Sequence, residues 1–267
     1  MYRKHKYTLT IKTIKNTILA LIAVLFIACD ADNKQTVGFY LTDAPANEGI
    51  VAVNVDIQSV RYSINDEDWI DVAINPVVVN LLDFSNGADT LLSNIELDEG
   101  LKVSQVRLIL GDNNTIEFAD GTIIPVKTPS AQTSGLKLNV QSFAEVHSGY
   151  KVVIDFDASR SIVKQGNGSY LLKPVIRSYI AVNSSSIYGT IKPENVATKI
   201  FTVDMQGDTI ATLSDTLQNN LFVLHGLNTG TYDIMYQDPE SGETLSLQPD
   251  VSVVGGFDVN LGELTLP

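Results

Sequence analysis

Residues 51–57 read Val-Ala-Val-Asn-Val-Asp-Ile, and this stretch indicates the fold class of the chain. Apolar side chains occupy every second position, with small or polar residues between them. Because successive side chains of a strand point to opposite faces, the alternation predicts a β-strand with one buried face. No window shows a sustained helical period, and a short helix or turn is expected only within residues 79–96.

Two turn signals predict hairpins in the neighbouring sequence. Residues 116–123 (IEFADGTI) contain Asp120-Gly121 between apolar runs, which is typical of a type I′ hairpin turn with positive φ angles. The stretch 166–168 (GNG) is expected to join strands within residues 151–163 and 169–182. Short strands at this spacing predict an all-β protein built of β-sandwiches.

The composition narrows the range of partners. The chain has 267 residues, and its 18 Lys and Arg against 31 Asp and Glu give a formal net charge of −13. A surface this acidic repels phosphate backbones, so nucleic acid is excluded as the main partner. The hydrophobic content of 44% argues against a disordered chain, and a single Cys excludes an internal disulfide.

The N-terminal residues are typical of an export signal. Residues 1–16 are basic and polar, and residues 17–28 form an apolar run that is too short to span a bilayer as a helix. The run ends in Ala28-Cys29, which resembles a bacterial lipobox. This predicts a lipoprotein signal peptide at residues 1–28 and a membrane anchor of acyl chains on Cys29. An ordinary secretory signal with a chance Cys is the alternative.

The predicted mature chain begins with a lipidated tether, residues 29–36. Its Asp30 and Asp32 resemble a surface-export signal in bacteria of the Bacteroidetes type, whereas in a proteobacterium Asp30 would suggest retention at the inner membrane. We therefore expect a cell-envelope protein, with an outer-membrane and surface-exposed position as one outcome. The leaflet stays open.

A polar segment at residues 183–186 (NSSS) predicts the boundary between two β-sandwich domains. The larger domain is expected at residues 37–182 and the smaller one at residues 187–267. The composition of the segment predicts a short, flexible linker.

The first of these regions resembles a bacterial and archaeal domain of unknown function, number 4382. The blocks that carry the resemblance are residues 41–45 (LTDAP), 105–108 (QVRL), 111–114 (GDNN), 127–130 (KTPS), 134–137 (SGLK), 155–158 (DFDA), 161–163 (SIV), 166–168 (GNG) and 172–177 (LKPVIR). The resemblance covers about residues 37–180 and implies a lipoprotein-borne β domain. It implies no activity, because the family has none assigned.

The second region resembles the carboxypeptidase regulatory-like domain, a transthyretin-like sandwich. Residues 222–234 (FVLHGLNTGTYDI) carry the resemblance. Their apolar residues alternate, and Gly226 and Gly230 are expected to permit a tight crossing between strands. In that family the module is an accessory that rarely carries chemistry.

Two aspartates flank Phe156 and share one face of a predicted strand. Asp155 and Asp157 suggest a Ca²⁺ site that Asp43 or the loop beginning at Asp112 would complete, because Ca²⁺ takes several oxygen ligands.

The favoured alternative to this metal site is a cross-strand ion pair. A hairpin symmetric about Asn167 would set Asp157 opposite Arg177, and opposite charges facing each other are ordinary in sheets.

The only Trp, Trp69, follows an acidic turn at residues 66–68. Its ring could stack on a sugar, since apolar ring faces suit aromatic platforms, or it could cap the edge of a sandwich. Paired His spacings typical of zinc sites are missing. Two Ser-x-x-Lys spacings, at residues 134–137 and 161–164, lie in strand-and-turn sequence where Ser and Lys would point to opposite faces.

These observations predict a non-catalytic binding or scaffolding lipoprotein, held on a membrane by Cys29, with a glycan or an envelope protein as its partner. A calcium-dependent adhesive module that uses the four aspartates is one alternative. An unrecognised hydrolase of the envelope is the other.

Overall fold

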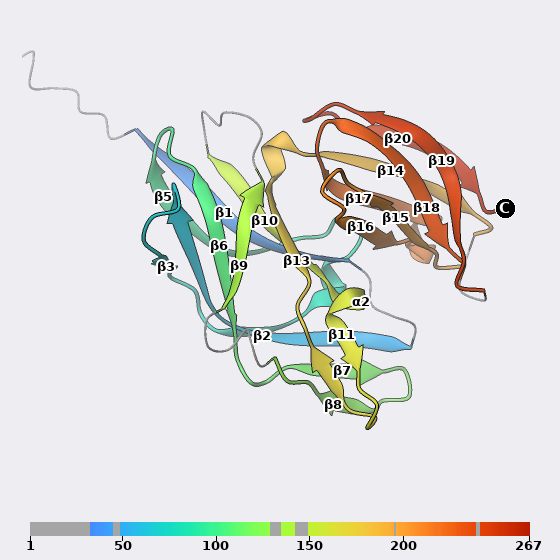
Figure 1. The fold of residues 1–267 in the computed structure, drawn as a ribbon, viewed down its shortest axis with the longest axis horizontal. Coiled ribbons are helices and arrows are strands. Elements are labelled where there is room, and N and C mark those ends of the chain that lie inside the picture. Colours follow the sequence, from blue (N-terminus) through green and yellow to red (C-terminus); the bar gives the residue numbers. More distant parts are fainter. Residues whose placement is uncertain (1–32, 45–48, 129–134, 142–148, 195, 239–240) are drawn as a thin grey trace, which may run out of the picture. The chain divides into compact units, whose positions relative to one another are not determined.

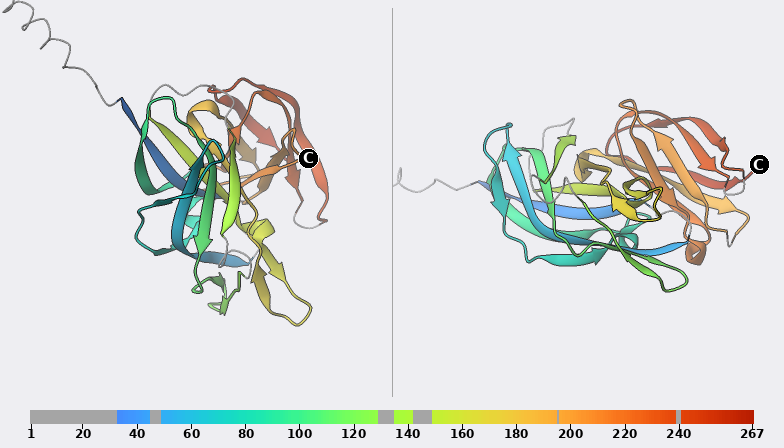
Figure 2. Two further views of the ribbon diagram at one scale, coloured as in Figure 1. Left: turned by 60° about the vertical axis from the view of Figure 1, so that its left-hand side comes forward. Right: turned by 60° about the horizontal axis from the view of Figure 1, so that its bottom comes forward.

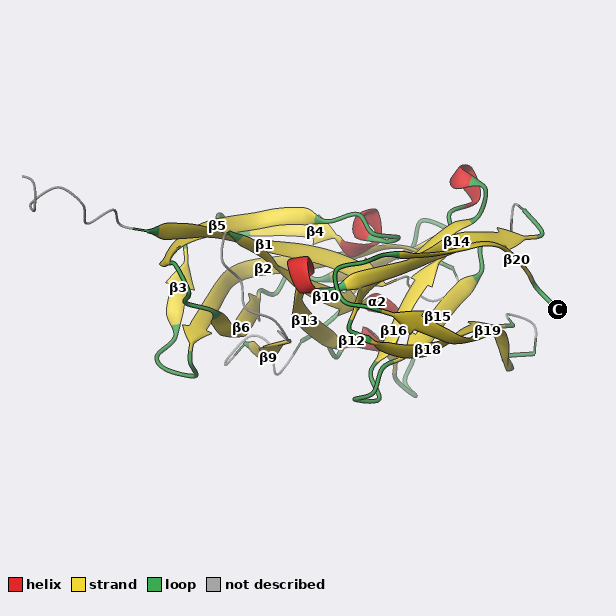
Figure 3. Cartoon of the chain, turned by 90° about the horizontal axis from the view of Figure 1, so that it is seen from above, coloured by secondary structure: helices red, strands yellow, loops and turns green. Residues whose placement is uncertain are grey.

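The structure is a computed structural model that describes residues 33–44, 49–128, 135–141, 149–194, 196–238 and 241–267. Cys29 and the predicted signal peptide lie outside these residues. Residues Gln35–Pro267 form one compact unit. Strands dominate it, as the alternation predicts, and Figure 3 shows the helices only as short red turns. In the described part of the chain, no helix is long and apolar enough to cross a membrane.

The first sandwich is built on a single 11-stranded sheet. Its order is β5-β1-β10-β13-β9-β6-β2-β7-β8, with β3 and β4 also pairing β2. A separate two-stranded sheet pairs β11 with β12. The strands of this region are β1 (Lys34–Ala44), β2 (Ile50–Ile64), β3 (Ile70–Val72), β4 (Val77–Asn80), β5 (Thr90–Asp98), β6 (Val103–Leu110), β7 (Thr115–Phe118), β8 (Ile123–Pro125), β9 (Leu136–Gln141), β10 (Tyr150–Asp157), β11 (Ile162–Lys164), β12 (Tyr170–Leu172) and β13 (Ile176–Ile180).

The alternation at residues 51–57 is confirmed in β2. Val53, Val55 and Ile57 are buried in the first hydrophobic core, while Val51 is exposed at the start of the strand. This core gathers apolar side chains from Val37 to Ile180. Removing them from water is the main favourable contribution to the stability of the sandwich.

The predicted hairpin at residues 116–123 is confirmed as β7–β8, in which Ile116 pairs with Ile124. The type I′ turn is wrong in detail, because Gly121 (φ 83°) has a positive φ and Asp120 does not. The loop is longer than two residues: the Phe118 N–H donates to the Thr122 carbonyl. One left-handed residue is enough to close a loop of this length.

The hairpin at residues 166–168 is also confirmed. In β11–β12, Ile162 pairs with Leu172, which is symmetric about Asn167 as expected. Figures 1 and 2 show this hairpin in yellow. The Leu172 N–H donates to the Lys127 carbonyl, so the hairpin is hydrogen-bonded to the chain that follows β8.

The register of the longer pair, β10 with β13, differs from the prediction. Arg177 lies opposite Asp155, not Asp157. The β10 side carries two more residues than the β13 side between this pair and the hairpin, because the short helix α2 (Ala158–Ser161) interrupts it. The predicted cross-strand ion pair is therefore present, but Arg177 pairs with Asp155 and not with Asp157.

The second sandwich consists of a three-stranded sheet, β17-β14-β20, and a four-stranded sheet, β16-β15-β18-β19. Its own core contains Phe222, Leu224, Tyr232 and Ile234, the alternating residues of the predicted signature. The strands are β14 (Ser185–Lys192), β15 (Lys199–Val203), β16 (Thr209–Leu213), β17 (Leu221–Leu227), β18 (Gly230–Gln237), β19 (Thr244–Val253) and β20 (Val259–Thr265).

Three short 3₁₀ helices complete the described elements: η1 (Leu81–Phe84), η2 (Ala181–Asn183) and η3 (Thr216–Gln218). The first of them lies within residues 79–96, where a short helix or turn is expected from the sequence.

The serine-rich segment between the two cores is not a free linker. Strand β14 begins at Ser185, inside the segment 183–186, and the Ser185 hydroxyl donates to the Val254 carbonyl. The Ser186 N–H donates to the Asp258 carboxylate at 2.7 Å. Polar composition suggested flexibility, but hydrogen bonds to the loop before β20 hold this connection in place.

Candidate binding site between the two sandwiches

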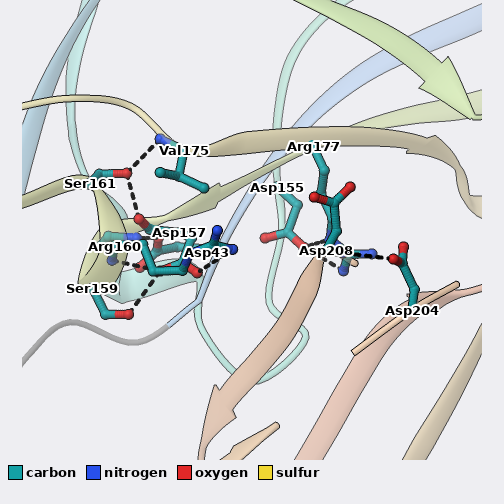
Figure 4. Close-up of polar contacts among 11 residues, drawn as sticks. Asp43, Asp155, Asp157, Ser159, Arg160, Ser161, Val175, Arg177, Asp204 and Asp208 are labelled. Carbon is teal, nitrogen blue, oxygen red and sulfur yellow. Dashed lines mark hydrogen bonds and ion pairs between the residues drawn. The ribbon is translucent and has the colours of Figure 1, made fainter. Parts of the chain in front are cut away.

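Arg177 on β13 connects the two sandwiches. Its Nε donates to the Asp155 Oδ2 at 2.7 Å, and both side chains are largely buried. Its two terminal nitrogens donate to main-chain carbonyls of β17, to Gly226 at 3.0 Å and to His225 at 2.6 Å. Figure 4 shows the guanidinium beside Asp155, with Asp204 and Asp208 of the second sandwich nearby. One side chain thus satisfies acceptors of both sandwiches.

Burial and charge shift the acidities around Arg177. Burial lowers the pKa of Arg177, but Asp155, Tyr179 and Asp204 together outweigh it and the net pKa is raised. Burial, reinforced by Asp155, raises the pKa of the Tyr179 hydroxyl well above its usual range. The guanidinium therefore stays charged and the phenol stays neutral, so both keep their protons as hydrogen-bond donors.

A cavity of about 410 Å³ opens between the sandwiches beside this contact. Side chains from both sandwiches line it. They include Asp89, Lys151 and Tyr179 of the first sandwich and Ser186, His225 and Asp258 of the second.

The polar side chains of the cavity are held by neighbouring groups. The Lys151 ammonium lies 3.3 Å from the Asp89 carboxylate. The Thr42 hydroxyl lies within hydrogen-bond distance of the carbonyls of Phe84 (2.9 Å) and Ala88 (2.7 Å), and it anchors the loop that leads to Asp89. Such contacts reduce the side-chain entropy that a ligand would otherwise have to remove on binding.

His225 packs tightly against the loop of Gly87. A Cβ on Gly87, whose φ is 88°, would lie 2.1 Å from the His225 Nε2, so only glycine fits there. The Nδ1 lies 2.9 Å from the Ser186 Oγ, and the buried Nε2 has no hydrogen-bond partner among the residues that the structure describes. Burial lowers the pKa of His225. A neutral ring with the proton on Nδ1 leaves an unpaired acceptor at Nε2 and avoids a buried unpaired N–H donor.

The Ser186–His225 pair does not have the geometry of a nucleophile with its base. In a catalytic triad the second ring nitrogen donates to a carboxylate that orients the imidazole. Here the second nitrogen faces the Gly87 backbone instead. The Ser161–Lys164 pair does not have this geometry either. The buried Ser161 hydroxyl donates to the Asp157 carbonyl and accepts from the Val175 N–H. Ser134, of the other spacing, lies outside the described residues.

The four aspartates of the predicted Ca²⁺ site have other contacts. Asp155 pairs with Arg177, the Asp43 carboxylate accepts from the Ala158 N–H at 3.1 Å, and Asp157 caps α2 by accepting from the Arg160 N–H at 2.9 Å. Asp43 and Asp157 thus stabilise the start of the helix that shifts the strand register.

The loop that begins at the exposed Asp112 forms hydrogen bonds with a different aspartate, Asp56. The backbone N–H and side-chain amide of Asn113 both donate to Asp56, and the Asn114 amide oxygen accepts from the Asp56 N–H. No group of three or more His, Cys, Asp or Glu able to hold a metal ion occurs among the residues that the structure describes. Calcium binding stays a prediction, and the structure does not bring these four residues together for it.

Trp69 lies between β2 and β3 and is partly exposed. The Arg107 guanidinium covers its ring at 4.1 Å from the centroid, and the Trp69 carbonyl accepts from Arg61. Trp69 is not among the residues that line the cavity. Sugar stacking on Trp69 stays a prediction, and a sugar on the covered face would have to displace Arg107.

Sequence reasoning missed the residues of the cavity. Asp89, Lys151, His225 and Asp258 are widely separated along the chain and form no motif of fixed spacing. The local sequence pattern that comes closest to marking the site is Asn86-Gly87, since Asn-Gly is typical of a turn. A turn signal does not reveal which strand the loop will contact.

The class that the fold defines is an all-β protein of two β-sandwiches. The family model of the domain of unknown function DUF4382 matches residues 34–174, more than half of the chain. The chain belongs to this family. No curated protein sequence matches the chain.

Solved structures give only distant similarities. A leucine-rich repeat protein from Bacteroides thetaiotaomicron matches with 8% identity and a TM-score of 0.19, covering 88% of this chain and 26% of that one. The Bacillus anthracis TIE protein matches with 12% identity and a TM-score of 0.23, covering 86% and 40%. BcpA, the major pilin subunit of Bacillus cereus, matches with 12% identity and a TM-score of 0.20, covering 87% and 70%. The chain spans well under two thirds of the first two, and TM-scores this low do not establish a common arrangement of strands.

Proposed function

We propose that this protein is a non-catalytic binding module of the cell envelope that holds a neutral, hydroxyl-rich ligand in the cavity between its two sandwiches. The observation that carries the proposal is the cavity itself, about 410 Å³ and lined by polar side chains of both sandwiches. Its size falls within the range of about 300–1,000 Å³ that is usual for small-molecule sites.

The charges in the cavity favour a neutral ligand. Lys151 is paired with Asp89, and Asp258 accepts from the Ser186 N–H. No surplus of positive charge remains among these groups to attract an anion. Carboxylates accept hydrogen bonds, and hydroxyls both accept and donate them, so both kinds of group are good partners for sugar hydroxyls without requiring a ligand charge.

An exposed aromatic residue is the chain neighbour of two lining residues. Phe257, whose side chain is 71% exposed, lies between the lining residues Gly256 and Asp258. Its N–H donates to the Val254 carbonyl and contacts the Ser185 hydroxyl at 3.2 Å, so the loop that presents it is anchored. An aromatic ring beside polar groups suits the apolar face of a sugar.

The proposal also includes the location of the protein in the cell. Acyl chains on Cys29 would hold the chain on a membrane, and the second sandwich would be an accessory module of the carboxypeptidase regulatory-like type. Cys29→Ser is expected to abolish incorporation of labelled palmitate and to move the protein from the membrane to the soluble fraction. Unchanged labelling would contradict the anchor. Proteinase treatment of intact cells, with a periplasmic protein as control, distinguishes the two leaflets.

The binding test uses the full chain, purified in detergent, on an array of neutral glycans, with hits measured by calorimetry. Phe257→Ala is expected to weaken binding about tenfold, which corresponds to about 1.4 kcal/mol. Leu217→Ala is the matched control, because Leu217 is 94% exposed and, unlike Phe257, has no lining residue as a chain neighbour. Equal losses in both variants, or turnover of a bound glycan, would contradict the proposal.

A further inference from the structure

We propose that the cavity is one end of a longer groove, and that the ligand is an extended neutral oligosaccharide. This inference rests on the proposed function and names the length of the ligand that the same site takes. It comes from a second depression, of about 620 Å³, that adjoins the cavity.

The two depressions share three lining residues and are therefore adjacent. Lys151, Ala181 and Val182 line both of them. Each depression falls within the usual size range of a small-molecule site, so together they offer more room than a single sugar ring needs. Val182, which is 58% exposed on η2, stands where they meet.

One strand runs beneath both depressions. Thr36, Gly38 and Tyr40 of β1 line the second depression, and Thr42 lines the cavity. Alternate residues of a strand lie on the same face, so these four form one row. From Thr36 to Thr42 the row extends about 20 Å, at about 3.3 Å per residue.

At the second depression, a glycine of β1 leaves room for the side chains of Tyr40 and Asn94. A Cβ on Gly38 would lie 2.6 Å from the Tyr40 ring and 3.0 Å from the Asn94 amide oxygen. Tyr40 therefore lies along the strand, close to Gly38. The Asn94 side chain adds an amide, which can both donate to and accept from hydroxyl groups.

Lys151 lies where the depressions meet, and its charge is already engaged. Its Nζ is 4.1 Å from the centroid of the Tyr40 ring and 3.3 Å from Asp89. A cation held by a ring face and a carboxylate gives little selectivity for an anion. The formal net charge of −13 further opposes a polyanionic chain. The groove therefore favours an uncharged polymer.

An extended peptide fits this groove less well. Peptides usually add to a sheet through main-chain hydrogen bonds at an exposed edge. Strand β1 lies between β5 and β10 in the sheet, so its main chain already has strand partners on both sides. The groove thus offers side chains on the face of a sheet, which are the groups that read hydroxyls and ring faces.

The test measures affinity against chain length. Calorimetry with the full chain would compare each glycan that binds as a disaccharide and as a hexasaccharide of the same linkage. We expect the hexasaccharide to bind at least about tenfold more tightly. Equal affinities would overturn the groove and leave the cavity site standing, whereas no binding at any length across the array would overturn both.

Tyr40→Ala is expected to remove the gain with length and to change disaccharide affinity less than about twofold. Asn94→Ala tests the same depression should Tyr40→Ala fail to fold. Tyr170→Ala is the matched control, because Tyr170 on β12 packs against Phe118 and lines neither depression. An equal loss for short and long ligands in Tyr40→Ala would overturn the proposal.

Discussion

At the residue scale, Arg177 shows how one buried charge can join two cores. Its guanidinium is nearly enclosed and contacts one carboxylate and two carbonyls. Desolvating a charge costs several kcal/mol, which only a complete set of partners offsets. Truncation of the Arg177 side chain would leave the Asp155 carboxylate and the two β17 carbonyls without the guanidinium that donates to them.

We therefore expect Arg177→Ala to lower the free energy of unfolding by about 3–5 kcal/mol. Arg160→Ala is the control, because Arg160 is 44% exposed and 3.9 Å from Asp157. An exposed pair of this kind contributes about 0–1 kcal/mol. Urea denaturation of both variants measures the difference. Comparable losses in the free energy of unfolding would show that Arg177 does not stabilise the contact between the sandwiches.

His225 makes a pH-dependent contribution to stability. Burial lowers its pKa in the folded protein, while Arg177 adds to the shift and the carboxylates of Asp155, Asp258 and Asp89 oppose it. The unfolded chain binds the proton with a pKa of about 6.5, and the folded chain binds it less readily. The stability due to neutral His225 is thus complete above about pH 6.5 and is lost as the pH falls toward the folded-state pKa.

His225→Gln should remove that part of the acid sensitivity. Thermal melts between pH 7.5 and 5 would show a shallower decline in melting temperature for the variant than for the wild type. Parallel curves would mean that other groups cause the decline. The carboxylates are shared by both proteins, so their titration cancels in the comparison.

At the element scale, Gly226 on β17 permits the close approach of the two sandwiches. Its φ is 70°, and a Cβ there would lie 2.5 Å from the Tyr179 ring. The pairing of β14 with β17 shifts register between Ser185 and Ile187, opposite this stretch. A local irregularity in two strands thus lets a carbonyl of β17 face Arg177.

Gly226→Ala is expected to destabilise the protein by about 1–3 kcal/mol, because a side chain at positive φ is strained and Tyr179 must move. Gly230→Ala is the matched control from the same predicted signature. Gly230 has no positive φ, and its nearest contact would be an ordinary 3.4 Å. It should be neutral or stabilising by up to about 1 kcal/mol. Equal losses in chemical denaturation would contradict this account.

The hairpins show how far local sequence predicts an element. The turn at residues 166–168 predicted the β11–β12 pairing correctly, because a turn sets the register of the strands directly beside it. The register of β10 with β13 was missed by two residues, since α2 adds chain on one side only. Four residues (158–161) capped by Asp157 are too short to give a helical period in the sequence.

At the scale of the whole molecule, the contacts around Arg177 should couple the two cores. We expect one cooperative unfolding transition for residues Gln35–Pro267, which form a single compact unit. Trp69 fluorescence reports on the first sandwich alone, and methyl NMR signals of Ile187 and Ile191 report on the second. Coincident urea midpoints are expected for the wild type and separated midpoints for Arg177→Ala. Separated midpoints in the wild type would show that the sandwiches unfold independently.

Local sequence was sufficient for the all-β class, the alternating core strands and both hairpins. These features depend on the period of the side chains and on turn residues within a few positions of each other. The family resemblance over the first sandwich was likewise carried by short blocks of residues, and the family match at residues 34–174 confirms it.

The candidate site depended on pairing over long distances. Asp89, Lys151, Tyr179, His225 and Asp258 meet only because β1, β10 and β13 are neighbours and because Arg177 holds β17 beside them. A shift of one residue in any of these pairings would turn the side chains to the opposite face. Such registers are set by the packing of two complete cores, which no short segment of the chain contains.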